Sequence, residues 1–578
     1  MPIKAYSSGM MMRQTFSVVT VVNSEILIVN EITEGNNFMV LTERKQRCYQ
    51  VWQAIEQLVR SRPLRTAFTA SFFSGVFIHF FALANFFVNH DSIVLPYNDL
   101  DWLLSQGKWF VTPLSSLEGP FVLNYLSMLI GLVAVSLCAG VLCKIFSIRS
   151  IWLARLIGVV MVAFPSVASI ILYVSLDYFA LAVLLAVLGA YFMMGDGWLN
   201  CLVGIGLVTL SLGAYQAFLG FALTILVLDC ALRLAKKEDV GKVVRRGLAY
   251  IGMAIVCLSL YYLVLQLRLY MTGITLSDYK GISSMTSNLR PAVLLSSVVT
   301  AWENVMCFFL RDQLGMGLPG WYLPGILLMV LLVWSCLSVC RKSGALRSPI
   351  HLVLLAILMV IVLPLAVNII GVLSANSSFY YISIYAFVLI PLAPLVFIND
   401  DPDSPQKTAV CFGGRVLSAC AACLLAVTSY LWIVQDNTAY QKILQLNQQL
   451  TAKSAVLTAQ IQSQPEYTSD TPVVLAGETP YVFLAPQGIS SSFSSKNTSP
   501  MGLFGDASQE IYSSGVLAAY LSNEMGINLN IEDQTELLAA EYDAVEALPV
   551  YPDAGSITYL DEKIVVRLSK ILPAQSGS

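Results

Sequence analysis

Charged residues are scarce in this chain. They make up 12% of the 578 residues, whereas hydrophobic residues make up 57%. Because an ordinary soluble domain carries about 25% charged residues, the composition argues against a soluble globular protein. Histidine occurs only as His79, His90 and His351, and no Cys/His spacing typical of a zinc site is present. The twelve cysteines fall mostly in apolar stretches and none lies in the last 150 residues, which argues against a disulfide framework.

Long apolar runs are present instead. They recur at a length of about 20 residues, and each is long enough to cross a hydrocarbon core of about 30 Å. We therefore predict an all-α polytopic membrane domain over 67–434 with about eleven transmembrane helices, followed by a small external α/β domain over 435–578. The predicted spans are 67–88, 121–147, 151–166, 169–193, 197–213, 215–233, 247–267, 321–340, 350–373, 379–398 and 412–434.

Lysine and arginine gather in four groups, which predict the orientation. The groups lie in the N-terminal arm 1–66, at 144–149, at 233–246 and at 341–347. Cytoplasmic loops carry an excess of Lys and Arg, and eleven crossings put all four groups on the cytoplasmic side. The N-terminus, with an amphipathic helix at 49–62, is then cytoplasmic, and the C-terminal domain lies outside.

The segment 291–310 is apolar enough to resemble a twelfth span, but it carries Glu303 and Asn304 in its middle. If it crossed, the basic group at 341–347 would be forced outside. We therefore predict a helix that lies in the outer interface or re-enters from it.

From Asp436 onward the chain is polar, with 16 Asp and Glu against 6 Lys and Arg, so we expect it to be solvated. Apolar residues at helical spacing over 443–461 predict a stalk helix. The strand-like PVVLAGETPYVFLA, a helical stretch near 508–525 and the pair SITYL and KIVVRL predict the α/β unit. This domain lacks His, Cys and a Gly-rich phosphate loop, and we expect it to serve acceptor binding or positioning rather than catalysis.

The predicted orientation brings polar residues from distant parts of the chain to the outer face. Polar groups at membrane depth are costly, so each is a functional candidate until a partner explains it. The candidates are Asp91, Asp99, Asp101, Lys108 and Trp109 in the first external loop 89–120, Asp177 and Tyr178, Tyr215 and Gln216, and then Arg268, Asp278, Tyr279, Lys280, Arg290 and Arg311.

Two kinds of chemistry fit these residue types. The external Lys and Arg as a set favour binding of a lipid phosphate, although for any one of them extension to headgroups from a helix end is the better explanation. Asp91, Asp99, Asp101 and Asp177 could supply a general base. Loop aspartates also cap helices and form turns, and this simpler explanation is strongest for Asp99 and Asp101 and weakest for Asp177. A proton or cation pathway would also explain an Asp at membrane depth.

Several motifs occur together: Asn89-His90-Asp91 after the first span, GKWF at 107–110, LDYFALA, LGAYQAFLGFAL, DYKG and the late LPVYPDAGSI. As a set they resemble the bacterial type II glucosyltransferase family, the phage-type O-antigen glucosyltransferases and their Gram-positive relatives. The resemblance covers about 67–572. It implies a GT-C-type enzyme of the bacterial inner or plasma membrane, which moves a sugar from a polyprenyl-phosphate donor to a cell-surface polysaccharide with inversion at the anomeric carbon.

The same resemblance assigns roles. It implies that Asp91, with Asp99 as its rival, matches the first acidic position of the family and that Asp177 matches the second. Lys108 stands where relatives commonly have Arg, which removes a bidentate phosphate contact. Lys108, Arg268, Lys280 and Arg290 are the expected phosphate-binding residues. The expected sugar-binding or acceptor-binding residues are Asp101, Trp109, Tyr178, Tyr215, Gln216 and Tyr279.

Alternatives remain open at this stage. A lipid-linked sugar flippase or transporter would place broken helices and charges near the bilayer midplane, whereas the polar groups here lie at the outer edge. A non-catalytic scaffold would leave Asp177 unexplained. Some GT-C enzymes use a divalent metal, but the sequence offers too few oxygen ligands to predict one, and no cofactor is assigned.

Overall fold

The computed structural model describes residues 61–571, apart from 86, 89–92, 94–100, 116–123, 173–175, 278–290, 312–321, 374–380, 399–410 and 478–513. Residues 60–578 form one compact unit. The predicted arm 1–66 therefore lies outside the described residues except at its end, where helix α3 already starts at Arg62. The predicted amphipathic helix at 49–62 likewise falls almost wholly outside them.

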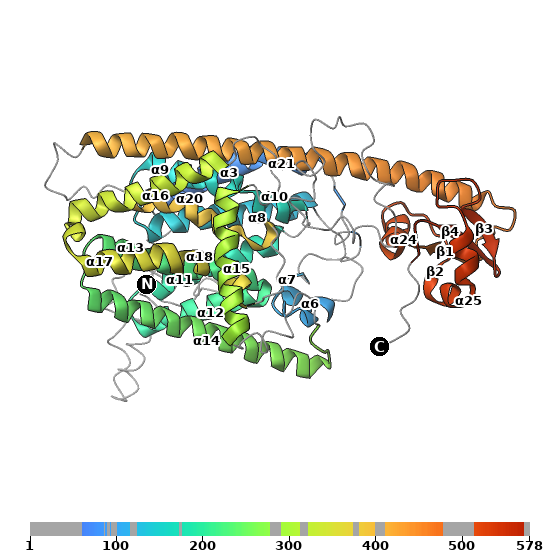
Figure 1. Ribbon diagram of the computed structural model, residues 1–578, viewed down its shortest axis with the longest axis horizontal. Coiled ribbons are helices and arrows are strands. Elements are labelled where there is room, and N and C mark those ends of the chain that lie inside the picture. The colour runs from blue at the N-terminus through green and yellow to red at the C-terminus, as the bar shows by residue number, and fades with distance from the viewer. Residues whose placement is uncertain are drawn as a thin grey trace, which may run out of the picture. The chain divides into compact units, whose positions relative to one another are not determined.

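Most described residues are helical (Figure 1). The first half holds α3 (Arg62–Ile78), α4 (Phe80–Ala84), α6 (Asp101–Ser105), α7 (Val111–Ser115), α8 (Asn124–Ile145), α9 (Ile151–Ala163), α10 (Pro165–Leu172), α11 (Leu176–Met194), α12 (Trp198–Ala214), η3 (Gln216–Phe218), α13 (Leu219–Ala235) and α14 (Val240–Thr272). The second half holds α15 (Pro291–Leu310), α16 (Tyr322–Ser343), η7 (Ala345–Arg347), α17 (Pro349–Ala356), the π-helix η8 (Ile357–Val362), α18 (Leu363–Val367), α19 (Ile369–Leu373), η9 (Tyr381–Ser383), η10 (Tyr385–Val388), α20 (Leu389–Ile398) and α21 (Cys411–Gln462).

Eight of the described helices are long and apolar enough to cross a membrane, or nine if the bent pair α9–α10 counts as one span. The chain is therefore a membrane protein. Predicted and observed ends agree within a few residues for α8, α12, α13 and α16. The count of about eleven spans stays a prediction, because α3, α12 and α20 are only 17, 17 and 10 residues long.

The helix predicted over 67–88 is in fact two helices, separated at His79. This side chain is fully buried, with one ring nitrogen 2.8 Å from the Tyr440 hydroxyl and the other 2.9 Å from the Val162 carbonyl oxygen. The partners belong to α21 and α9. Because they are tertiary contacts, the break leaves no trace in the local hydropathy.

The boundary predicted between the third and fourth spans, near 167, is wrong. Phe164 is extended (φ −70°, ψ 131°) because the ring of Pro165 disfavours a helical conformation at the preceding residue. The chain bends there by 41° but continues as α10 to Leu172. Asp177 consequently lies in the first turn of α11, not within a longer helix.

The predicted span 350–373 contains a π-helical segment. Pro364 has no N–H and cannot bond the carbonyl of Val360 four residues earlier. That carbonyl instead accepts the indole N–H of Trp302 on α15, at 2.8 Å. The Asn368 amide also donates to the Ala301 carbonyl, at 3.0 Å. These two bonds join α15 to the irregular part of its neighbour.

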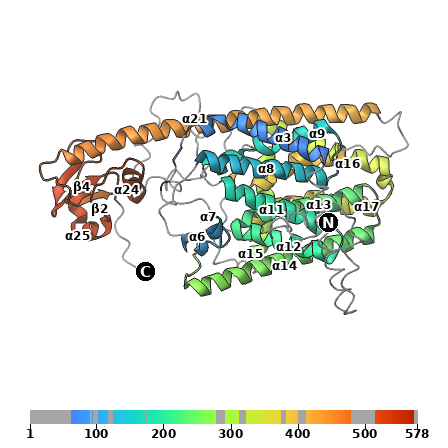
Figure 2. The ribbon, with the colours of Figure 1, turned by 180° about the vertical axis from the view of Figure 1, so that it is seen from behind.

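Helix α15 corresponds to the segment predicted to lie in the interface. It runs across the direction of α14, α16 and α21 in Figure 1, whereas α14 and α21 lie along opposite sides of the helices in both views (Figures 1 and 2). By length and composition alone it also qualifies as a membrane span. The helix itself is confirmed, and its place in the membrane stays a prediction.

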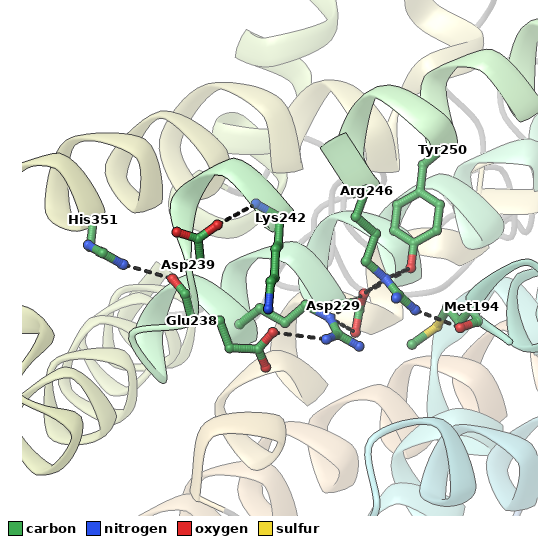
Figure 3. A network of polar contacts seen from close by, with 9 residues as sticks. Met194, Asp229, Glu238, Asp239, Lys242, Arg246, Tyr250 and His351 are labelled. Carbon is green, nitrogen blue, oxygen red and sulfur yellow. Dashed lines mark hydrogen bonds and ion pairs between the residues drawn. The ribbon is translucent and has the colours of Figure 1, made fainter. Parts of the chain in front are cut away.

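Basic residues of α13, α14 and the α16–α17 connection meet at one end of the helices, here called the basic end. Asp229 is buried there and accepts bonds from Arg233, Arg246 and Tyr250 at 2.9–3.1 Å (Figure 3). The Ser343 hydroxyl at the end of α16 donates to the Ala235 carbonyl at the end of α13, at 2.6 Å, and this bond joins the two helix ends. Two of the predicted basic groups, at 233–246 and 341–347, thus lie on the same side, as the span count requires.

Helix α21 runs for 52 residues without a break. It includes both the predicted last span, 412–434, and the predicted stalk. Asp436, expected to begin the solvated region, is instead fully buried, and neither of its carboxylate oxygens has a hydrogen-bond partner among the described residues. The expectation of solvation is wrong here because the chain around His79 packs against this part of α21.

The C-terminal region forms a small α/β unit, the class that the sequence predicted, and its sheet has four strands. It holds β1 (Val473–Ala476), α24 (Ser514–Asn523), β2 (Ile531–Glu532), α25 (Gln534–Ala547), β3 (Ile557–Leu560) and β4 (Lys563–Arg567). The strand order is β2-β1-β4-β3, with β1 parallel to β2 and β4. Asp561 and Glu562 join β3 to β4 at positive φ, the conformation that a two-residue hairpin turn favours. Helix α25 and the short strand β2 were not predicted.

Candidate active site

The turn between α6 and α7 is built around Gly107. Its φ is +78°, in the left-handed region that favours glycine. A Cβ at this position would lie 2.8 Å from Gln216 Nε2 and would collide with the Tyr261 hydroxyl. The turn therefore needs glycine both for its conformation and for its close approach to η3 and α14.

Gln216 and Tyr261 hold this turn by its backbone. The Gln216 amide donates to the Gln106 carbonyl at 3.1 Å and to the Tyr261 oxygen at 2.8 Å. The Tyr261 hydroxyl in turn donates to the Gly107 carbonyl at 3.1 Å. Three segments that are far apart in the sequence are thereby tied together at the end of the helices opposite the basic end, here called the loop end.

The Trp109 indole packs against Gly213 at the end of α12. A Cβ on Gly213 would come within 2.5 Å of the ring, and the Phe110 N–H donates to the Gly213 carbonyl at 2.8 Å. Trp109 is only 8% exposed. Little of its ring is left to stack on a sugar, so its observed role is to support the turn.

Lys108 lies beside an aromatic cluster. Its Nζ is 5.7 Å from the centre of the Tyr215 ring, a cation–π contact. Tyr215 in turn packs edge-on against Phe179, with ring centres 4.6 Å apart, and Phe179 contacts Tyr178. The start of α11 therefore lies close to Lys108.

Asp177 lies two residues before Phe179, in the first turn of α11. It is 9% exposed, and its Oδ1 has no hydrogen-bond partner among the described residues. The positive end of the helix dipole stabilises a carboxylate in this position. The burial agrees with a functional role, although a helix-start carboxylate needs no such role.

Arg268 lies on the same face of α14 as Tyr261 and Leu265, because these residues are spaced four and three apart. It is half-buried, and its Nε has no hydrogen-bond partner in the part of the chain that the structure describes. After α14 the chain returns to α6, where the Ser277 N–H donates to the Ser105 carbonyl at 3.0 Å. Ser277, the last described residue after α14, therefore lies beside the turn.

The structure brings together Lys108, Trp109, Asp177, Tyr178, Tyr215 and Gln216, and Arg268 lies on the helix face that meets them. Asp101 is exposed in the first turn of α6, in line with the helix-start role favoured for it. Asp91, Asp99, Tyr279, Lys280 and Arg290 lie outside the described residues. No three His, Cys, Asp or Glu side chains among the described residues come together as a possible metal site.

Sequence reasoning missed two residues of this site. Tyr261 lies in the apolar run LSLYYLVLQL, where a hydroxyl at membrane depth was the available signal. Gln106 is 1% exposed, and neither its side-chain nitrogen nor its oxygen has a partner among the described residues. Its position directly before the GKWF motif gave no indication of such burial.

The fold and site define a polytopic membrane protein with a polar site assembled at one end of its helices. The model of the glucosyl transferase GtrII family matches residues 80–391, more than half of the chain. The protein therefore belongs to the GtrII glucosyl transferase family and is a membrane glycosyltransferase, which acts on a sugar donor and an acceptor. No curated protein and no solved structure matches the chain. The motifs GKWF, LDYFALA and LGAYQAFLGFAL all fall within the matched range and contact one another.

Proposed function

We propose that this enzyme transfers a hexose such as glucose from a polyprenyl-phosphate donor to a cell-surface polysaccharide on the outer face of a bacterial membrane. The observation that carries the proposal is the meeting of three family motifs at the loop end, with Lys108 beside Tyr215. The family match also favours an enzyme over the lipid-linked sugar flippase that the sequence left open.

Cationic side chains are proposed to bind the phosphate of the donor. Lys108 and Arg268 are both half-buried; Lys108 rests on the Tyr215 ring, and Arg268 lies on the adjoining face of α14. The leaving group is a phosphate monoester, whose negative charge a nearby cation stabilises. Lys280 and Arg290, from the chain that follows α14, are proposed to complete this set.

The reaction is proposed to be a single displacement, which inverts the anomeric carbon. The acceptor hydroxyl oxygen forms a bond to that carbon while the bond from the carbon to the phosphate oxygen breaks. The hydroxyl proton passes to a carboxylate, and polyprenyl phosphate leaves with the bonding electron pair. Asp91 is the proposed base, with Asp99 as the alternative, since the acceptor hydroxyl is a poor nucleophile without one.

Other residues are proposed to orient the substrates. Asp177 would support the acceptor from the start of α11, close to Tyr178 and Tyr215. Asp101 and Tyr279 are proposed to contact the sugar or the acceptor as well. Gln216 bonds to the backbone of the turn and to Tyr261, and Trp109 packs against Gly213 at the end of α12. We therefore assign them to holding Lys108 in place rather than to direct sugar contact.

The substitution Asp91→Asn tests the base. It keeps the shape of the side chain and removes its basicity, so we expect transfer to fall about 10²–10⁴-fold while binding of the donor lipid is unchanged. Transfer of radiolabelled sugar from polyprenyl-phosphate glucose in proteoliposomes measures the rate. Asp101→Asn is the matched control and should reduce the rate only mildly. Normal transfer by Asp91→Asn together with an inactive Asp99→Asn would assign the base to Asp99.

A further inference from the structure

Asn447 on α21 binds both backbone groups of Val88. The Val88 N–H donates to Asn447 Oδ1 and the Asn447 amide donates to the Val88 carbonyl, both at 2.9 Å. Val88 is 6% exposed and Asn447 is 9% exposed. A carboxamide satisfies a peptide group in this way because it offers one donor and one acceptor side by side. Val88 is the last described residue before Asn89-His90-Asp91.

A second asparagine binds the chain on the other side of that motif. Ile93 is 1% exposed, and its carbonyl accepts a bond from the Asn523 amide at 3.3 Å. Asn523 is the last residue of α24, in the C-terminal region. In the sequence, Asp91 follows one anchored residue, Val88, by three positions and precedes the other, Ile93, by two.

The two asparagines are linked to each other. The Thr451 hydroxyl donates to the Asn447 carbonyl at 2.9 Å and lies 2.8 Å from the Tyr520 hydroxyl. Tyr520 stands one helical turn before Asn523 on α24. A continuous set of contacts thus runs from Val88 through α21 and α24 to Ile93, with partners up to 430 positions apart in the sequence.

We propose that Asn447 and Asn523 are positioning residues for the transfer reaction, because they hold Val88 and Ile93, which flank the proposed base Asp91 in the sequence. The inference rests on the proposed function of Asp91. It also gives the C-terminal region a part in positioning the reacting groups, in place of the acceptor-binding role expected from its composition. Misplacing a reacting group by about 1 Å can cost about 10²-fold in rate.

The test compares Asn447→Ala with Gln448→Ala, its exposed neighbour on the same helix. We expect kcat of Asn447→Ala to fall about 10–10²-fold with KM for the donor lipid near that of the unchanged enzyme, and Gln448→Ala to retain full activity. Asn523→Ala should have a smaller effect in the same direction, since its bond is longer. Equal loss in both kcat and donor affinity, or no loss in either asparagine variant, would overturn the proposal.

A double-mutant cycle separates this inference from the proposed function. If Asn447 acts through Asp91, adding Asn447→Ala to Asp91→Asn leaves the residual rate unchanged, because the base is already lost. Independent, multiplying losses would overturn the positioning role while leaving Asp91 as base. An active Asp91→Asn enzyme would instead overturn the proposed function. Should the alanine variant fail to fold, Asn447→Asp, which retains the acceptor for the Val88 N–H, carries the same cycle.

Discussion

Two glycines determine how closely the turn after α6 approaches the helix ends. Gly107 is required by its positive φ and by the side chains of Gln216 and Tyr261, whereas Gly213 is required only by the flat contact with Trp109. The two positions can therefore be told apart experimentally. At Gly213 the backbone is helical, so an added methyl group causes no backbone strain and acts through packing and helix propensity.

Gly213→Ala is expected to lower the melting temperature in detergent and to reduce transfer. The gain in helix propensity, about 1 kcal/mol, is outweighed by the cost of overpacking, about 1–3 kcal/mol, because the Trp109 ring has to move. Gly206→Ala on the same helix is the control, since a Cβ there meets nothing within 4 Å. Equal melting temperatures and rates for the two variants would show that Trp109 is not held by Gly213.

The sequence alone identified those site residues that belong to recognisable motifs. The motifs of Lys108, Tyr215 and Asp177 could be assigned to one face because an even number of predicted membrane crossings separates them. Tyr261 and Asn447 could not be found in this way. Their partners lie 154 and 359 positions away in the sequence, and no spacing rule reports such pairs.

At the scale of elements, hydropathy located the long helices but not their interruptions. His79 and Val360 lie inside apolar runs, yet the helices are irregular there. His79 bonds to α9 and α21, and the Val360 carbonyl, which Pro364 cannot bond, accepts from α15. Pro165 was a visible signal, but the helix resumes directly after it instead of turning back. Local composition therefore predicted which segments form apolar helices better than it predicted where each helix ends.

The orientation of α15 can be tested by cysteine labelling at its two ends. A helix in the interface exposes both ends on one side of the membrane, whereas a spanning helix exposes them on opposite sides. We expect Asn288→Cys and Arg311→Cys to react with a membrane-impermeant maleimide from the outside of intact cells. The background should lack Cys420 and Cys423, which are exposed. Labelling of Arg311→Cys only from the cytoplasmic side would reverse the predicted side of the C-terminal domain.

At the scale of the whole molecule, α21 connects the helices of the membrane domain to the sheet at its C-terminal side. Asn447 lies on this helix, and Asn523 lies beyond β1 on α24. The family match ends at residue 391, before either of them. The part of the chain outside the matched range therefore supplies both anchors of the segment that carries Asp91.

Two truncations should have graded effects. A chain that ends after Tyr467 keeps Asn447 and loses Asn523, so its transfer rate should resemble that of Asn523→Ala. A chain that ends after Val434 loses both anchors and should be at least as slow as Asn447→Ala. Rates are compared in proteoliposomes at equal amounts of folded protein, judged by size-exclusion chromatography. Full activity of the chain that ends after Val434 would restore the accessory role for the C-terminal region.

The unbroken course of α21 also limits how this chain can change length. Tyr440 contacts His79 and Asn447 contacts Val88, seven residues apart on one face of the helix. Each inserted residue turns the following part of a helix by roughly 100°, so a single insertion between these positions would rotate Asn447 away from Val88. Seven inserted residues would nearly restore the angle but add about 10 Å of height. Rotational phase, and not length alone, therefore constrains insertions and deletions between these two contacts.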